Sequence, residues 1–434
     1  MKKVRFVYPR FQRHAEAHPE LLEHVPCNEY FGPPSLGIAC IAAVTPSRWA
    51  VEFRNDRVED VGLDDCDDVD VIALSFFTAA ARRGIELADA FRARGKTVVA
   101  GGIFPTMMPD ELRSHVDAVI IGEGEGVWPE LLRDFEDGTL KPVYKERAPV
   151  DLATLPLPRV DLYIEREGPR YCPDDYPVQV SRGCPLSCNA CVLPASMGPK
   201  LREYPHDHVI GQLEQLAKHN KLASFTEDTS FFVFGGTQRR FGDLTNRIAE
   251  SIGAAKVSYI GISMPMILAT PASVFERMRR AGIAMFYLVG GFDPITMNAF
   301  TGQNPKAYKR GVDAIKKCFD VGIEPYTSFL LGNDDDDLGT ADRMLAFADE
   351  TGIRKAEFAI MTPYPGTPVW KRLVAEGRIL TRDWSRYNDA NVVFQRKHMS
   401  PDQLLEGYLR LWREFYRPRQ SLKGWDREAR TIQF

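Results

Sequence analysis

Three cysteines lie within eight residues of this sequence, at Cys184, Cys188 and Cys191. The spacing C-x3-C-x2-C places three thiols on one short loop, directly after a strand-like run that ends in Ser181-Arg182. Three thiolates hold three irons of a [4Fe-4S] cubane and leave the fourth iron open, in contrast to the four-cysteine set of an electron-transfer cluster. The spacing therefore predicts an iron–sulfur site with one position open to a ligand.

A structural zinc site is the alternative, and it would need a fourth protein ligand such as His206 or His208. The cysteines follow the first strand of a predicted barrel and do not form a compact zinc knuckle, which favours the cluster. Disulfides are not expected either, because the other cysteines show no paired rhythm and a reducing cytoplasm favours metal binding. These cysteines are Cys27, Cys40, Cys66, Cys172 and Cys318.

Length and charge narrow the function classes. A chain of 434 residues exceeds the usual size of one core, so two domains and a smaller C-terminal piece are expected. The net charge of -4 offers no basic excess for a nucleic-acid partner. The sequence contains no run of eighteen apolar residues, and the N-terminus leads straight into a strand, so we predict a cytoplasmic protein without a membrane span.

Residues 1–137 alternate short β-branched runs with helical segments, which predicts a doubly wound parallel sheet of the Rossmann-like type. Such sheets bind ligands at the carboxyl ends of their strands. Glycines in these loops are either tight turns or places where the backbone approaches a bulky ligand. The candidate loop residues are Ser75, Thr78, Gly101, Gly102, Gly122 and Glu123.

The rest of the chain divides into three parts. Residues 138–177 are rich in proline and predict a linker. Residues 178–370 repeat a strand–helix pattern six times, which predicts a partial (βα)6 barrel with its active site at the carboxyl ends of the strands. Residues 371–434 predict a small helical region, in which Ser400, Pro401 and Gln403 match a helix-capping box.

The cysteine spacing and its place on the first barrel strand resemble the radical S-adenosylmethionine (SAM) superfamily. Together with the N-terminal doubly wound domain, the organisation resembles the cobalamin-binding class, the class B methyltransferases, and in its tail the members that act on hopanoids and bacteriochlorophyll precursors. The resemblance covers nearly the whole chain. It implies three cofactors, namely a [4Fe-4S] cluster, SAM and cobalamin.

The resemblance implies a role for each matching residue. Cys184, Cys188 and Cys191 would ligate the cluster, and SAM would chelate the open iron. The aromatic residue that often precedes the last cysteine is replaced by Ala190, so adenine would have to pack elsewhere. The SAM contacts implied at the ends of later strands are Glu227 or Asp228, Ser263 and Gly290.

The resemblance also implies that residues 1–137 bind cobalamin. The D-x-H-x-x-G signature, whose histidine ligates cobalt, is absent, so the resemblance implies a mode without a protein histidine. The glycine-rich loops of residues 1–137 would then surround the nucleotide tail. Phe104, Met107 or Met108 would either face the corrin or pack in the core.

Methyl transfer to an unactivated carbon of a small molecule, apolar or tetrapyrrolic, is the leading function that the resemblance implies. One SAM would supply the methyl group to cobalamin, a second would give a 5'-deoxyadenosyl radical, and flavodoxin or ferredoxin would supply electrons. The alternatives are radical oxidation, hydroxylation, cyclisation or rearrangement without net methylation, and a cobalamin- or redox-sensing module. A methylthiotransferase is also open, with an extra cluster on Cys27, Cys40 and Cys66.

Overall fold

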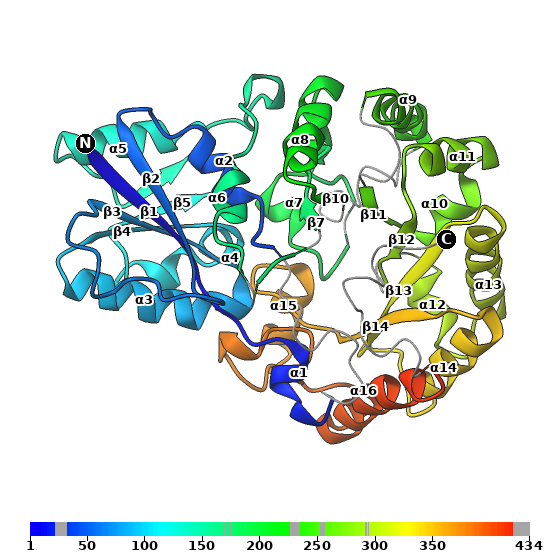
Figure 1. Ribbon diagram of the computed structural model, residues 1–434. Coiled ribbons are helices and arrows are strands. Elements are labelled where there is room, and N and C mark those ends of the chain that lie inside the picture. The colour runs from blue at the N-terminus through cyan, green and yellow to red at the C-terminus, as the bar shows by residue number, and fades with distance from the viewer. Residues whose placement is uncertain are drawn as a thin grey trace.

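The computed structural model describes residues 1–21, 33–168, 171–173, 175–186, 188–225, 235–251, 257–290, 293 and 295–419. The described residues contain two parallel sheets of six strands each and one small sheet of two strands, and Figure 1 shows the two larger sheets side by side with the second one curled. No helix within the described ranges has the length and apolar character needed to cross a membrane.

The first sheet has the strand order β2-β1-β3-β4-β5-β6, and all of its neighbouring strands are parallel. Its strands are β1 (Lys2–Tyr8), β2 (Trp49–Asn55), β3 (Val71–Ser75), β4 (Thr97–Gly101), β5 (Ala118–Ile121) and β6 (Val143–Lys145). The chain reverses its winding direction between β1 and β3, where a crevice forms at the carboxyl ends of the strands. The sheet thus has the topology of a ligand-binding doubly wound domain, as predicted.

Alternating apolar residues explain why helices cover both faces of this sheet. Val4 and Phe6 of β1 belong to one core cluster with α2 (Gly37–Ala43) and α5 (Trp128–Glu136). Val7 belongs to the opposite cluster with α3 (Ala81–Ala93). Strands buried on both faces are typical of parallel sheets, and this pattern gives the sheet a rigid frame for its loops.

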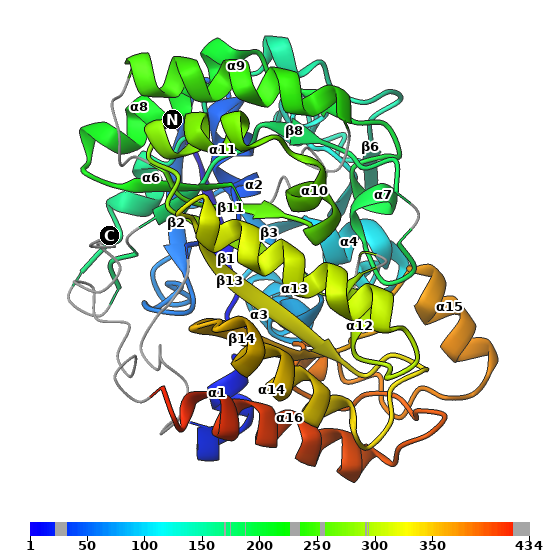
Figure 2. The same ribbon diagram turned by 90° about the vertical axis from the view of Figure 1, so that its right-hand side faces the viewer.

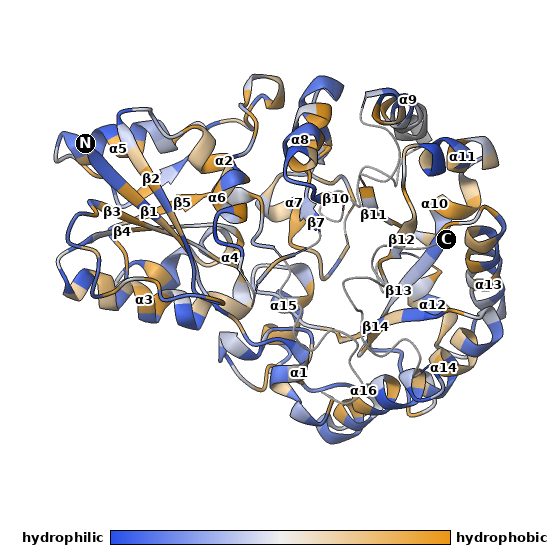
Figure 3. Ribbon diagram, in the orientation of Figure 1, coloured by the Kyte–Doolittle hydropathy of each residue, from blue (hydrophilic) through white to orange (hydrophobic). Residues whose placement is uncertain are grey.

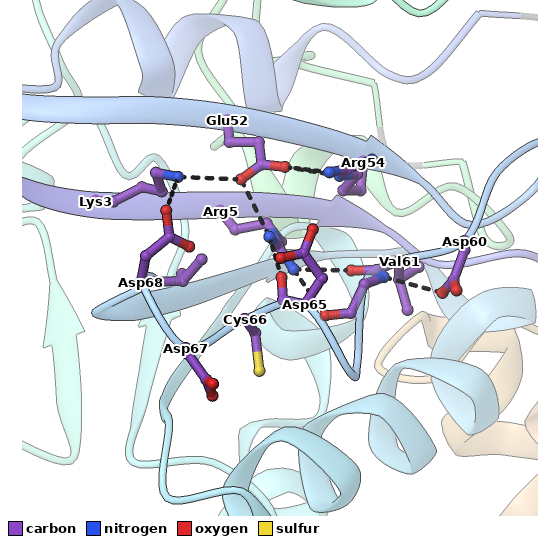
Figure 4. A network of polar contacts seen from close by, with 12 residues as sticks. Lys3, Arg5, Glu52, Arg54, Asp60, Val61, Asp65, Cys66, Asp67 and Asp68 are labelled. Atoms are coloured by element: carbon purple, nitrogen blue, oxygen red, sulfur yellow. Dashed lines mark hydrogen bonds and ion pairs between the residues drawn. The ribbon is translucent and has the colours of Figure 1, made fainter.

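A buried arginine holds the long connection between β2 and β3 (Figure 4). Arg5 is 1% exposed, and its guanidinium donates to the carbonyls of Gly62 at 2.8 Å and Asp65 at 2.6 Å. The same group pairs with Glu52 of β2 at 3.2 Å. Because a buried charge must be paired and hydrogen-bonded, this network fixes the connection against the sheet, away from the carboxyl ends of the strands.

The second sheet has the order β14-β13-β12-β11-β10-β7, which confirms a parallel six-stranded partial barrel. Its strands are β7 (Asp175–Pro177), β10 (Leu222–Phe225), β11 (Val257–Ile262), β12 (Met285–Leu288), β13 (Glu324–Leu331) and β14 (Lys355–Ile360). The outer helices are α8 (His206–Lys218), α9 (Gly235–Ser251), α11 (Ala272–Arg280), α13 (Pro305–Asp320) and α14 (Thr340–Thr351). In Figure 2, α11 and α13 lie toward the viewer, and α8 and α9 lie along the upper side of the molecule.

Figure 3 shows that the outer helices of the barrel alternate apolar and polar residues along their length. On α13, for example, Val312, Ile315 and Cys318 are buried, and they follow the three- to four-residue spacing of one helix face. Short helices α10 (Met264–Ala269) and α12 (Thr296–Ala299) follow β11 and β12. The barrel therefore buries its apolar helix faces against the outside of the sheet.

The segment 138–177, predicted as a linker, contributes to both sheets. β6 pairs with β5 through Val143, Tyr144 and Lys145, and β7 pairs with β10. The helix α6 (Asp161–Ile164) lies between them and carries Tyr163, whose hydroxyl accepts from the backbone N–H of Ala39. A run of three residues is too short to show the alternation of apolar and polar residues that predicts a strand. The surrounding prolines indicated a linker instead, so β6 and β7 were not predicted.

The C-terminal region is helical, as predicted, with α15 (Pro368–Ala375) and α16 (Pro401–Tyr416). Ser400 and Gln403 form the capping box, with Pro401 in the first turn. α16 packs on β14, where the ring centroids of Trp412 and Phe358 are 5.3 Å apart. The apolar stripe of α16 is therefore a packing surface that completes the barrel.

Candidate active site

The three cysteines lie on the loop between β8 (Ser181–Arg182) and α7 (Leu193–Ser196). β8 pairs with β9 (Arg202–Glu203) in a small antiparallel sheet. Gly183 has a φ of 81°, and a Cβ there would lie 2.3 Å from the carbonyl oxygen of Lys200. Only glycine fits this turn, which directs the chain from the sheet into the cysteine loop.

The thiols are enclosed and close enough to influence one another. Burial, together with the neighbouring Cys188 and Cys184, raises the pKa of Cys191 to about 11. Burial also raises the pKa of Cys188. Three thiolates would repel one another here without a cation, and iron supplies that charge by holding cysteine as thiolate. The donor set thus fits a three-cysteine cluster.

The part of the chain that the structure describes offers the zinc alternative no set of converging ligands. Among the described residues, no three His, Cys, Asp or Glu converge as they would on a single metal ion. His208 instead stacks on Tyr204, with ring centroids 4.6 Å apart, and lies within hydrogen-bond distance of Gln212. A cubane distributes its cysteines over separate irons, so the thiols need not meet at one point.

A large cavity opens at the carboxyl ends of the first sheet. It contains about 1520 Å³ of empty space, part of it open to solvent. Tyr8, Ser75 and Gly101 line it from the ends of β1, β3 and β4. Leu193 and Met197, which follow the cysteine loop, line its opposite wall. The cavity therefore lies between the doubly wound domain and the cysteine loop.

The loops on the sheet side of the cavity fit a bulky ligand. Gly122 has a φ of 84°, and a Cβ there would meet no atom within 4 Å. Its N–H donates to the hydroxyl of Thr106 at 3.0 Å, which ties the loop after β5 to α4 (Ile103–Met107). A glycine held in place beside open space forms a cradle that a side chain would fill. The residues present therefore fit a corrin at this position.

The structure separates the predicted cobalamin contacts into two groups. Of the predicted contacts, those that line the cavity are Ser75, Gly101, Gly102, Gly122 and Glu123. Thr78 and Phe104 are not among the lining residues and are 2% and 0% exposed. Phe104 packs on Trp384 from the C-terminal region, with ring centroids 5.5 Å apart. It belongs to the core because α4 turns this ring away from the cavity and Ile103 toward it.

The predicted SAM contacts follow neighbouring strands of the barrel. Ser263 is the N-cap residue of α10 and directly follows β11, and Gly290 follows β12, whose Leu288 is paired with Ile262. A Cβ at Gly290 would lie 2.0 Å from the carbonyl oxygen of Ser328 on β13, so this glycine permits a close approach of two backbones. Glu227 and Asp228 lie outside the described residues, after the end of β10.

Tyrosines line the inner face of the curled sheet, a feature that the sequence patterns did not reveal. The rings of Tyr287 on β12 and Tyr326 on β13 are 5.4 Å apart, and Tyr259 on β11 is 6.4 Å from Tyr287. The hydroxyls of Tyr287 and Tyr326 both donate to the carboxylate of Glu357 on β14. Half-buried aromatic side chains with a few fixed polar groups are typical of small-molecule sites.

Residues from both ends of the chain extend this inner face beyond β14. Asp389 accepts a hydrogen bond from the Tyr364 hydroxyl at 2.8 Å, and burial raises the pKa of Asp389. His14 interacts electrostatically with Asp389 and Glu357, and burial lowers the pKa of His14. No local sequence pattern signals this grouping, because its members come from residues 14, 357, 364 and 389.

Local sequence patterns also do not reveal the ion pairs that join the loop after β5 to the small β8–β9 sheet. Glu123 and Glu125, in the loop after β5, pair with Arg202 of β9 and Arg182 of β8, each at 2.6 Å. All four side chains are at least four-fifths buried. The Gly-Glu-Gly-Glu-Gly run is a visible signal for a special loop, but the arginines that pair with it lie on β8 and β9, distant in the sequence.

The extra-cluster alternative is not supported by the cysteine positions. Cys40 and Cys66 are buried in core clusters on opposite faces of the first sheet. Cys66 lies 3.3 Å from the carbonyl oxygen of Leu63, and Cys40 lies 3.7 Å from a guanidinium nitrogen of Arg182. Cys27 is outside the described residues. A cluster shared by Cys40 and Cys66 would have to pass through the sheet.

Comparison with known proteins agrees with this arrangement. Residues 30–132 match the model of the B12 binding domain. The resemblance to the cobalamin-binding radical SAM enzymes is confirmed. Residues 367–433 match a domain of unknown function, DUF4070, which corresponds to the helical tail.

Similar proteins span most of this chain. Bacteriochlorophyllide d C-12(1)-methyltransferase of Chlorobaculum tepidum is 27% identical over 89% of this chain and 84% of its own length. Hopanoid C-2 methylase of Rhodopseudomonas palustris is 22% identical over 91% of this chain and 73% of its own. The structure of the radical SAM methyltransferase TsrM from Kitasatospora setae, with tryptophan and a SAM analogue bound, superposes with a TM-score of 0.63 at 16% identity over 87% of this chain and 76% of TsrM. The last similarity establishes the fold that sequence reasoning predicted.

Proposed function

We propose that this protein is a cobalamin-dependent radical SAM methyltransferase that transfers a methyl group from SAM to an unactivated carbon of a small molecule. The observation that carries the proposal is the cavity whose one wall is the glycine-rich edge of the first sheet and whose other wall follows the three cysteines. In this proposal the corrin would occupy this space, and the cluster would lie next to it, on the loop that leads into Leu193. The similar methyltransferases support the same reaction class.

In this proposal each part of the site has a role of its own. When bound, the cluster supplies the electron that cleaves SAM, and cobalamin carries the methyl group. Cys184, Cys188 and Cys191 hold the cluster, and the loops at Gly101 and Gly122 approach the corrin. The apolar side chains of the cavity exclude water, which protects reactive species from side reactions.

The methyl acceptor is proposed to bind on the inner face of the barrel, beside Tyr259, Tyr287 and Tyr326. These rings offer a conjugated or apolar substrate extensive contact, and Glu357 provides a fixed hydrogen-bond acceptor. Relatives named for bacteriochlorophyllide and hopanoid substrates agree with a large ring system. The polar wall of His14 and Asp389 would orient such a molecule.

The electron source and cellular location belong to the same proposal. A low-potential protein such as flavodoxin or ferredoxin is the donor that this chemistry requires. The described cysteines form no disulfide bonds, which is consistent with a reducing compartment and supports the cytoplasm as the site of action.

Cofactor retention tests this proposal. The protein is purified without oxygen, reconstituted with iron, sulfide and cobalamin, and desalted before its absorption spectrum and metal content are measured. We expect about four irons and near-stoichiometric cobalt with corrin absorption. Iron without retained corrin would contradict methyl transfer and favour radical chemistry that does not use cobalamin.

A further inference from the structure

Arg182 occupies the point where the cavity wall meets the cysteine loop. It is the last residue of β8, and only Gly183 separates it from Cys184. Its side chain is 6% exposed, and the residue lines the cavity together with Glu125 and Gln179. Arg182 is therefore connected to both cofactor regions, through its backbone to one and through its side chain to the other.

The guanidinium is held from several directions. Its Nη2 atom donates to Glu125 at 2.6 Å and lies 3.7 Å from the Cys40 sulfur. Its Nη1 atom is 3.5 Å from Glu123, and its Nε donates to Gln179 at 3.1 Å. Glu123 and Glu125 belong to the glycine-rich loop after β5, so these contacts join that loop to the strand that carries the cysteines.

Stability alone does not explain such a buried ion pair. Replacing a buried pair by apolar side chains of the same volume is often neutral or stabilising, because removing two charges from water is costly. What a planar guanidinium adds is direction, since its fork fixes several acceptors in one geometry. The guanidinium of Arg182 also lies over the ring of Tyr204, 5.7 Å from the ring centroid.

The link between Arg182 and the first cysteine is stiff. Gly183 has a positive φ and lies against the carbonyl oxygen of Lys200, and the N–H of Cys184 donates to the carbonyl of Gly198 at 3.1 Å. A single constrained residue cannot absorb a shift of its neighbour. A shift of the β8 backbone at Arg182, once its side chain no longer holds the glutamates, would therefore be passed on to Cys184.

We propose that Arg182 is a positioning residue, which holds the cysteine loop and the cobalamin loops at one fixed separation through Glu123 and Glu125. The inference rests on the proposed function, because it assigns a task within the same two-cofactor site. The reaction needs the two cofactors to serve one substrate, so their separation sets whether methyl transfer follows radical formation. Lysine cannot replace this arginine, because an ammonium lacks the fork.

Pulsed electron paramagnetic resonance measures this separation directly. The reconstituted holoprotein is partly reduced with dithionite, and the dipolar coupling between cob(II)alamin and the reduced cluster is recorded. We expect one narrow distance distribution in the wild type. Arg182→Gln and Arg182→Lys should each broaden it about twofold at equal iron and cobalt content, because neither side chain reproduces the fork.

A matched control separates the positioning role from the loss of any arginine. Arg240 pairs with Glu203 of β9 and is 61% exposed, so Arg240→Gln should leave the wild-type distribution unchanged. If Arg182→Gln does not retain both cofactors, the same distance is measured in Glu125→Gln, which removes one charge of the same ion pair. The distance distribution of Glu125→Gln should broaden as well. Wild-type widths in Arg182→Gln, or in Glu125→Gln where that variant is measured instead, would overturn the positioning role and leave the proposed function intact. A wild-type protein that retains no cobalt would contradict the proposed function, and the positioning role would fall with it.

Discussion

The carboxylate of Glu123 lies 2.6 Å from the guanidinium of Arg202, although 79 residues separate them in the chain. A second contact joins the same groups at 3.0 Å, and the N–H of Val150 donates to the same carboxylate. Glu123 lines the cavity, but its carboxylate is bound by Arg202 and Val150 of the protein itself. It therefore shapes the loop beside the proposed cobalamin site.

Glu123→Gln should destabilise the folded protein in a pH-dependent way. Burial alone would raise the pKa of Glu123, but the hydrogen bond from Arg202 and the charge of Arg182 outweigh it and hold the pKa below its usual value. The carboxylate thus stabilises the fold above pH about 4.3, and this contribution is lost as the pH falls through the lower folded value. Urea unfolding at pH 7 should show a loss of about 3 kcal/mol.

The pH profile distinguishes this buried pair from a surface charge. The difference between Glu123→Gln and wild type should shrink below pH about 4.3. Glu130, which pairs with Lys141 and is 44% exposed, serves as the control, and Glu130→Gln should cost less than about 1 kcal/mol. An effect of Glu123→Gln that stays constant from pH 7 to pH 3 would refute the ion-pair account.

Gly122→Leu should prevent cobalamin retention. The substitution strains a backbone with a φ of 84° by about 1–2 kcal/mol and projects a side chain into the cavity. Gly138 has a φ of 70° and also no atom within 4 Å of a Cβ, but it does not line the cavity. Gly138→Leu should thus lose similar stability and keep cobalt, as measured by metal analysis after desalting. Equal cobalt in both variants would count against the cavity as the corrin site.

Phe104→Ala should lower thermal stability and spare cobalamin binding. The ring is fully buried against Phe76 and Trp384, and removing a buried phenylalanine costs about 3–5 kcal/mol. The adjacent Ile103 lines the cavity, so Ile103→Ala should lower cobalt retention with a smaller loss of stability. Calorimetry and cobalt analysis of both variants check this. If Phe104→Ala loses cobalt and Ile103→Ala does not, Phe104 contacts the corrin and its assignment to the core is wrong.

Substituting any one of Cys184, Cys188 and Cys191 by alanine should abolish the cluster spectrum and SAM cleavage. Each thiolate holds a different iron, so a variant with only two of the three cysteines does not retain the cluster. Cys318 is fully buried on α13 and lies in a core cluster. Cys318→Ala should keep full iron content, and iron analysis after reconstitution compares the four variants. Retained iron in all of them would contradict the assigned ligand set.

The sequence predicts those parts of the site that local spacing defines. The three thiols lie within eight residues, so proposing them as a ligand set needs no knowledge of the fold. Ser75, Gly101 and Gly122 were found because strand ends of a parallel sheet meet at one edge. These residues depend only on recognising the strands and their order along the chain.

Contacts between residues that are distant in the sequence could not be predicted from local sequence patterns. Arg182 lies on β8 and Glu125 in the loop after β5, and neither stands out among the many charged residues of the chain. Phe104 follows a glycine pair that suggested a loop, but α4 forms there and turns the ring toward Trp384. In both cases a partner distant in sequence decides the side-chain environment.

The fate of the SAM methyl group tests the central claim most directly. Reduced holoprotein is incubated with SAM that carries a deuterated methyl group, and the extracted corrin and small molecules are analysed by mass spectrometry. The account predicts a labelled methyl group on the corrin together with S-adenosylhomocysteine and 5'-deoxyadenosine. Formation of 5'-deoxyadenosine alone, with an unlabelled corrin and no S-adenosylhomocysteine, would contradict it.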